Sequence, residues 1–251
     1  MSRAVTVVGT GRAGSSFADA LTSAGWPVRR VAGRDLGAVE QAAGGADLVL
    51  VCVADTAVAD VSARIAPAGN TVVAHVAGAL GLDVLAPHPR RGSLHPLVSM
   101  PDAERGARRL RRAWFAVAGD PVVHEVVDVL DGRRFAVPDG ERVRYHAAAC
   151  VASNHLVALM GQVERLCAAV GVPVDAMWEL ACGSLDNVVE VGAVAALTGP
   201  AARGDRATVA SHVEAIGADE AELYTVLSDA ARRLATHDAT ATPERGGDRA
   251  C

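Results

Sequence analysis

Short, continuously apolar runs alternate with amphipathic stretches over the first half of the chain. Apolar runs without polar alternation are typical of parallel strands that are buried on both faces of a sheet. Glycine and proline end the segments between them, as Gly25 and Pro27 do after the helical stretch at 13–24. The pattern therefore predicts a doubly wound, mostly parallel α/β domain over residues 1–138. Its predicted strands are 4–8, 28–32, 47–53, 71–74, 114–118 and 135–137.

The pattern changes after Pro138, where Asp139 can cap the start of a helix. From Arg142 to Val170 the sequence contains no proline and one glycine, Gly161, and Gly171 follows. About 30 helical residues at ~1.5 Å each predict a helix roughly 45 Å long.

Further helical periodicity predicts an all-helical domain over residues 139–236. A polar tail, residues 237–251, follows it and is predicted to be disordered. The other helices of this domain are predicted at 174–197, 206–216 and 219–236.

A glycine-rich turn follows the first predicted strand directly and matches the pattern GxGxxG. In this context Gly9 permits a tight turn, Gly11 lets the backbone approach a pyrophosphate, and Gly14 allows close packing of helix and strand. An ordinary glycine-rich turn is the alternative. The dinucleotide-binding residues predicted here are Gly9, Thr10, Gly11, Arg12, Ala13 and Gly14.

The end of the second predicted strand bears on the choice between NADP(H) and NAD(H). The strand runs into Gly33 and Arg34, where NAD-binding proteins usually carry an acidic residue. A guanidinium at Arg34 suits a 2′-phosphate, which favours NADP(H). Asp35 lies about 20 residues beyond the glycine motif and keeps NAD(H) open as the less favoured cofactor.

Composition limits the chemistry that the chain can perform. Its 24 basic residues are all arginine, so no lysine can act as a Schiff base, a proton donor or a phosphate ligand. The net charge of −5 argues against a nucleic-acid partner, and we expect none. The five cysteines form no CxxC pair or zinc-type spacing, so no metal site is predicted. With no leader or membrane-spanning run in the sequence, we expect a cytoplasmic protein without a membrane partner.

Two further turns lie at predicted carboxyl ends of strands, the edge where open α/β sheets bind ligands. Ala54 and Asp55 follow the third strand. His75, Ala77 and Gly78 end the fourth, and small residues there let the backbone come close to a nicotinamide ribose. A cofactor or substrate role for His75 and a buried structural role are both open.

His95 is predicted to lie in another turn near the same edge, within residues 93–97. Pro96 restricts it to an extended backbone, which would hold its direction. A histidine can donate a proton near neutral pH, as carbonyl reduction requires. A loop histidine without a role is the alternative.

The long predicted helix carries a polar face. His146, Cys150 and Ser153 fall at i, i+4 and i+7, with Asn154 beside them. Polar groups on a helix rich in Ala, Val and Leu indicate a ligand or a polar contact between helices or subunits. We expect Asn154 to fix the substrate, His146 to serve as an acid, and Ser153 to orient a water.

Six segments carry a family resemblance: GTGRAG, VCVADTAVADV, HVAGALGLDVL, SLHPL, YHAAACVASNHL and LTGPAARGD. The chain resembles two-domain oxidoreductases that join an NADP-binding Rossmann-like domain to a helical domain of 6-phosphogluconate-dehydrogenase type. It is most similar to a branch that pairs the Rossmann-like domain with a domain of unknown function, near pyrroline-5-carboxylate reductase and ketopantoate reductase. That branch commonly carries hydroxyl side chains where this chain has Val76 and Ala77.

The resemblance implies that the long helix faces the cofactor cleft and that the helical domain forms a homodimer. It also implies that a polar loop carrying Thr198, Arg203 and Asp205 reaches a substrate site, where Arg203 could bind a carboxylate. Related reductases place a lysine on the long helix as proton donor, which this chain lacks.

The expected function is the NADPH-dependent reduction of a small carbonyl substrate, most simply a 2-oxo acid of ketopantoate type. An imine reductase of pyrroline-5-carboxylate type is one alternative, because an iminium ion already carries its proton. A non-catalytic NADP-binding sensor is the other, and the missing hydroxyls at Val76 and Ala77 favour it.

Overall fold

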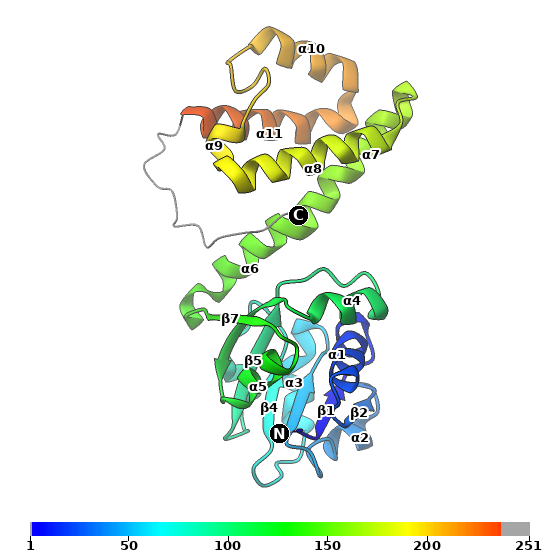
Figure 1. Ribbon diagram of the computed structural model, residues 1–251, viewed down its shortest axis with the longest axis vertical. Helices are drawn as coiled ribbons and strands as arrows, with labels where there is room; N and C mark the ends of the chain where they lie inside the picture. The colour runs from blue at the N-terminus through cyan, green and yellow to red at the C-terminus, as the bar shows by residue number, and fades with distance from the viewer. Residues whose placement is uncertain (1, 237–251) are drawn as a thin grey trace. The chain divides into compact units, whose positions relative to one another are not determined.

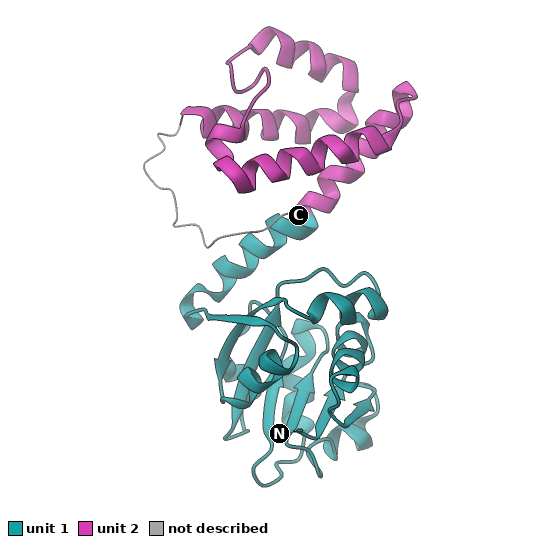
Figure 2. Ribbon diagram, viewed as in Figure 1, with its two compact units in different colours: residues 1–154 teal, residues 155–251 magenta. Residues whose placement is uncertain are grey.

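The computed structural model describes residues 2–236 (Figure 1). The predicted tail at 237–251 lies outside the described residues. The chain divides into two compact units, unit 1 (Met1–Asn154) and unit 2 (His155–Cys251) (Figure 2).

Unit 1 is built on a seven-stranded sheet with the order β2-β1-β3-β4-β5-β6-β7. Neighbouring strands are parallel except β5 and β6, which pair antiparallel, with Leu94 opposite Val117. The predicted α/β fold class, with its mostly parallel sheet, is therefore confirmed. The strands are β1 (Val5–Val8), β2 (Val28–Val31), β3 (Leu48–Val51), β4 (Val72–His75), β5 (Arg91–Pro96), β6 (Trp114–Gly119) and β7 (Arg133–Ala136).

Helices cover both faces of this sheet, which explains why its central strands are apolar throughout. Alternate residues of β3 belong to different cores: Leu50 packs in the cluster that contains Phe17 of α1, and Val49 in the cluster that contains Ile65. All four β3 residues are consequently buried. The helices of this unit that precede β7 are α1 (Arg12–Ser23), α2 (Leu36–Glu40), α3 (Val58–Arg64), α4 (Ala103–Leu110) and α5 (Val122–Val129).

The sequence prediction missed strand β5 and placed His95 in a turn, which is wrong. His95 lies within β5, opposite Ala116 of β6. The strand lacks a continuous apolar run, yet its middle is buried between β4 and β6. At Gly92 an added Cβ would come within 2.5 Å of Val123 Cγ1, so glycine lets α5 pack against β5.

The helix predicted from Asp139 onward differs from the observed structure in two ways. Residues Asp139–Glu141 form a 3₁₀ turn, η3, and the Asp139 carboxylate accepts a hydrogen bond from Arg142 Nε instead of capping a helix. The segment then consists of α6 (Arg142–Cys150), a π-helical segment η4 (Val151–His155), and α7 (Leu156–Val170). Unit 1 extends to Asn154, beyond the boundary at 138, because α6 packs against the turn that follows β4 and against His95 of β5.

Unit 2 contains α7 and four further helices within the described residues. The prediction that the second half of the chain is helical is therefore confirmed. No residue of α8, α10 or α11 is buried. Among the described helices, none is long and apolar enough to cross a membrane. The helices are α8 (Val174–Val191), α9 (Ala193–Ala196), α10 (Arg206–Ile216) and α11 (Ala218–Thr236).

Candidate functional site

The glycine-rich turn between β1 and α1 is closely packed at two of its glycines and open at the third. Gly9 has φ +118°, and a Cβ there would lie 2.2 Å from Cys52 O. A Cβ at Gly14 would lie 2.0 Å from Gly9 O. At Gly11 no atom lies within 4 Å of that position. The turn thus requires glycine for packing at Gly9 and Gly14, and leaves the backbone accessible at Gly11.

Helix α1 begins directly after this opening. Its N-cap, Gly11, provides no side-chain hydrogen bond, and the first turn of the helix contains no acidic residue. Thr10 and Arg12 are exposed, while Ala13 is half-buried. Uncapped N–H groups at the positive end of a helix dipole suit an anion, and the open backbone at Gly11 suits the pyrophosphate of a dinucleotide.

The end of β2 gives its two charged residues different surroundings. Asp35 is the N-cap of α2 and accepts a hydrogen bond from Ala38 N at 3.1 Å. Arg34 is exposed. A Cβ at Gly33 would lie 3.1 Å from Val53 Cγ1, so the turn after β2 lies close to the turn after β3.

The turns after β3 and β4 differ in accessibility. Ala54 and Asp55 are exposed at the start of the 3₁₀ turn η1 (Asp55–Ala57). His75 is fully buried, and both of its ring nitrogens bind backbone: Nδ1 accepts from Ala77 N at 3.2 Å, and Nε2 lies 3.0 Å from Gly81 O. Because Nδ1 accepts, Nε2 carries the hydrogen and donates it, and burial lowers the pKa of this imidazole. His75 thus holds the loop containing Ala77 in place.

Two histidine side chains lie against Gly78, and a tyrosine contacts one of them. A Cβ at Gly78 would lie 2.5 Å from His146 Cδ2 and 2.9 Å from His95 Nε2. His95 Nδ1 lies 2.6 Å from the Tyr145 hydroxyl, and the His95 and His146 rings meet edge to face at 5.7 Å. The structure therefore brings together three predicted residues, Gly78, His95 and His146, and adds Tyr145.

Burial, followed by the nearby His146 and Arg142 charges, lowers the pKa of His95 to about 4. A pKa this low favours the neutral form of His95 near pH 7. The role of His95 as a proton donor remains a prediction. Burial raises the pKa of Tyr145 to about 12, against the opposing effect of Arg142. Tyr145 keeps its proton at neutral pH and can donate it in a hydrogen bond.

The polar face predicted on the long helix spans the change from α- to π-helix. Cys150 Sγ lies 4.0 Å from both ring nitrogens of His146. Ser153 Oγ lies 2.7 Å from Ala149 O and 2.8 Å from Asn154 Oδ1, and Asn154 itself is exposed. The expected roles of Ser153 and Asn154 remain predictions. Their position in a π-helical segment is one in which functional residues are frequently found.

Arg142 and Tyr145 were not among the residues predicted from sequence. Arg142 is 1% exposed, and its Nη1 and Nη2 atoms have no hydrogen-bond partner among the described residues. Tyr145 and His146 lie at i+3 and i+4 of Arg142, so each of them is a neighbour of Arg142 on the surface of α6. That spacing could have indicated both Arg142 and Tyr145. A single arginine, however, is not a specific signal in a chain with 24 basic residues.

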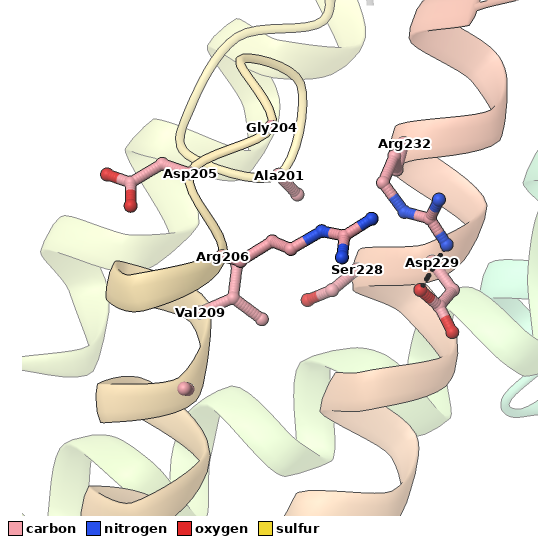
Figure 3. A pocket seen from close by; sticks show the side chains of 9 residues that line it. Ala201, Gly204, Asp205, Arg206, Val209, Ser228, Asp229 and Arg232 are labelled. Carbon is pink, nitrogen blue, oxygen red and sulfur yellow. Dashed lines mark hydrogen bonds and ion pairs between the residues drawn. The ribbon is translucent and has the colours of Figure 1, made fainter.

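The predicted substrate loop lies in unit 2. Thr198 and Arg203 are exposed, and Asp205 caps α10, accepting hydrogen bonds from the backbone and hydroxyl of Thr208. These bonds lower the pKa of Asp205. A cavity of about 350 Å³ lies beside the loop; Arg206 extends toward α11 within it, and Asp205 points away (Figure 3).

Two family descriptions match the chain. Residues 23–101 match a Rossmann-like domain, and residues 115–231 match DUF2520, a domain of unknown function. Together they give the domain order that the sequence resemblance implied. Comparison with curated proteins finds no match.

Several solved structures share the fold at low sequence identity. A Bacteroides fragilis protein proposed to be an NADP oxidoreductase has a TM-score of 0.78 at 20% identity, over 92% of this chain and 98% of its own. A reductive aminase from Aspergillus terreus, solved with NADPH and ethyl-5-oxohexanoate, has a TM-score of 0.65 at 17% identity, over 95% of this chain and 97% of its own. Pyrroline-5-carboxylate reductase from Streptococcus pyogenes has a TM-score of 0.61 at 14% identity, over 92% and 99%.

Proposed function

Because the chain joins a Rossmann-like domain to a DUF2520 domain, we propose that it is an NADP(H)-dependent oxidoreductase. The observation that carries this proposal is the turn at residues 9–14. Gly9 and Gly14 are required by packing, whereas Gly11 faces open space next to the uncapped start of α1. A pyrophosphate can therefore come close to the backbone at Gly11, and a side chain at this position would stand in its way.

The preference for NADP(H) rests on the end of β2. Asp35 is already engaged as the cap of α2, whereas Arg34 is exposed and can pair with a 2′-phosphate. Solved structures of the same fold include a reductive aminase with NADPH bound.

The proposed reaction is reduction of a small carbonyl substrate, most simply a 2-oxo acid. When bound, NADPH supplies the hydride. The protein then has to place a proton at the carbonyl oxygen without a lysine. Tyr145 is the hydroxyl donor suited to this, because its proton is retained at neutral pH and His95 at 2.6 Å fixes its direction.

Reduction of an imine is the second candidate. Two proteins of the same fold act on such chemistry by name, a reductive aminase and a pyrroline-5-carboxylate reductase. The low pKa of His95 favours this candidate, because the site then lacks a strong acid at neutral pH and an iminium ion needs none. The exposed groups in unit 2, Thr198 and Arg203, stay candidates for holding the substrate in either reaction.

We also propose a homodimer formed through unit 2. Large apolar side chains on its helices are exposed, Leu180 at 64% and Val226 at 56% among them. Apolar surface of this extent on a soluble chain indicates a protein interface, and a second copy offers the same apolar helices to cover it.

The cofactor proposal is tested with the binding of NADPH and NADH to the wild type, Arg34→Ala and Arg30→Ala. Arg30 is the matched control, an exposed arginine of β2 that pairs with Asp19. We expect Arg34→Ala to weaken NADPH binding by about tenfold or more and NADH binding by less than about twofold. Equal losses for both cofactors would contradict the role of Arg34.

Turnover is tested separately, by following NADPH oxidation with a panel of 2-oxo acids and cyclic imine acids. Loss of rate in Tyr145→Phe with carbonyl but not imine substrates would identify the tyrosine as the proton donor. Binding of NADPH without turnover across the panel would favour the sensor alternative. Absence of NADPH binding by the wild type would remove the proposal.

A further inference from the structure

Arg142, at the start of α6, is a buried cation in which only one of the five N–H donors has an acceptor among the described residues. Its side chain is 1% exposed. Nε donates to Asp139 Oδ1 at 2.9 Å, whereas Nη1 and Nη2, both closed to solvent, have no acceptor among the residues that the structure describes. The Asp139 side chain is itself 66% exposed, so solvent screens its charge and it compensates the buried charge of Arg142 only in part.

Such an arrangement is unfavourable unless a ligand completes it. Buried charges in proteins are ordinarily paired and fully hydrogen-bonded, because removing an ion from water is costly. Two residues further along α6, Arg144 shows the usual alternative: its side chain is 83% exposed and pairs with Glu141. Among the arginines between residues 2 and 236, only Arg142 is buried.

The free edge of Arg142 lies among the groups of the candidate site. Tyr145 and His146 follow on the same face of α6 at i+3 and i+4. The Arg142 charge acts on His95 and His75, contributing to the lowered pKa of each after the larger effect of burial. These neighbours are a neutral imidazole, a hydroxyl and a histidine whose nitrogens bind backbone, so none supplies an anion.

The loop after β4 packs closely against the start of α6 and the turn before it. An added Cβ at Gly81 would lie 3.7 Å from the Asp139 carboxyl, and one at Gly78 would meet His95 and His146. Two glycines thus bring the backbone of this loop close to Asp139, the partner of Arg142, at Gly81, and close to the two imidazoles at Gly78.

We propose that Arg142 binds the carboxylate of the substrate, with Nη1 and Nη2 each donating a hydrogen bond to one carboxylate oxygen. The end-on edge of a guanidinium has the spacing for such a bidentate contact. This inference rests on the proposed function and narrows it to acids, with the reducible carbon next to Tyr145 and His95. The carboxylate reaches the two nitrogens when side chains on this face of α6 move, of which Tyr145 is the largest.

Oxamate and ethyl oxamate are the probes, because they share the amide and differ in whether the second carbonyl group is charged. Their binding is measured by calorimetry and by the shift in unfolding temperature, with and without NADP⁺. The variants are Arg142→Met, which removes the charge at similar volume, and Arg144→Met as the exposed control. NADPH binding is recorded for every variant.

We expect the wild type and Arg144→Met to bind oxamate at least about tenfold more tightly than ethyl oxamate. Arg142→Met should lose this preference and retain NADPH binding within about twofold. Without ligand, Arg142→Met should unfold at a temperature about 2 °C higher or more, because an uncompensated buried charge has been removed. A purely structural arginine would instead lower the unfolding temperature when replaced.

Three results would overturn the inference: no preference of the wild type for oxamate, an unchanged preference in Arg142→Met, or an Arg142→Met variant that fails to fold. Equal protection by inorganic phosphate and oxamate would also contradict a carboxylate site. If the wild type does not bind NADPH, the proposed function fails, and the oxamate measurements without cofactor still decide whether Arg142 is a carboxylate site.

Discussion

Unit 1 encloses two apolar cores within a single chain, whereas α8, α10 and α11 of unit 2 contain no buried residue. The two units differ little in their supply of apolar residues along the sequence. They differ in whether the chain itself covers them: strands β1, β3 and β4 are buried throughout, while Leu180 and Val226 face outward. An apolar pattern in the sequence therefore predicts that side chains are buried. It does not predict whether the same chain or another molecule covers them.

The sharpest way to test this difference is to truncate one apolar side chain in each unit. Phe115 is fully buried in β6, so Phe115→Ala should lower the free energy of unfolding by about 3–5 kcal/mol. Leu180→Ala should change it by no more than about 0.5 kcal/mol when the chain is monomeric. Urea denaturation of both variants at low protein concentration measures the contrast. Similar losses would show that the isolated chain covers Leu180.

A smaller effect should distinguish the histidine–tyrosine pairs of the two units. The folded-state pKa of His95 is about 4 against an ordinary value of 6.5, so the unfolded state binds more protons between these values. Its contribution to stability is complete above pH 6.5 and is lost as the pH falls toward 4, amounting to about 2 kcal/mol at pH 5. Buried His75, whose pKa is also lowered, adds a loss of the same sign.

Denaturation at pH 7 and pH 5 tests this expectation. His95→Gln should reduce the difference between the two pH values. His212→Gln is the matched control, because His212 makes an exposed pair with Tyr224 in unit 2, at the same 2.6 Å. An equal reduction in both variants would mean that burial is not the cause.

The smallest expected effect concerns how unit 2 covers its apolar helices. If a second copy does so, Leu180→Asp should weaken dimerisation by about tenfold or more, because a charge at the interface loses its water. Sedimentation equilibrium measures the dissociation constant. A monomeric wild type at micromolar concentration would contradict the dimer, as would an unchanged constant in the variant.

Most of the fold could be predicted because its strands are apolar runs, and β5 shows where that signal ends. Residues Arg91–Pro96 contain arginine, glycine, histidine and proline, and become a strand because β4 and β6 lie on either side. Contacts between distant parts of the chain, here across the sheet, are absent from a local pattern.

The candidate site shows the same limit. The glycines at 9–14 could be recognised because each spacing has a local steric meaning. The pairing of Tyr145 with His95 joins residues 50 positions apart, and the approach of Gly78 to His146 joins two segments that are further apart still along the chain. Neither relation has a spacing that could be read from the sequence.

The contact between Gly9 and Cys52 also bears on how the dinucleotide would bind. Gly9 is held against the end of β3, and burial raises the pKa of the Cys52 thiol beside it to about 12, so this support is an uncharged, inert part of the core. The turn is therefore preorganised: its backbone is fixed when the sheet folds and does not have to be ordered by the ligand. Preorganised sites bind with a smaller loss of conformational entropy. Association should consequently be limited by encounter with the turn and not by rearrangement of its backbone.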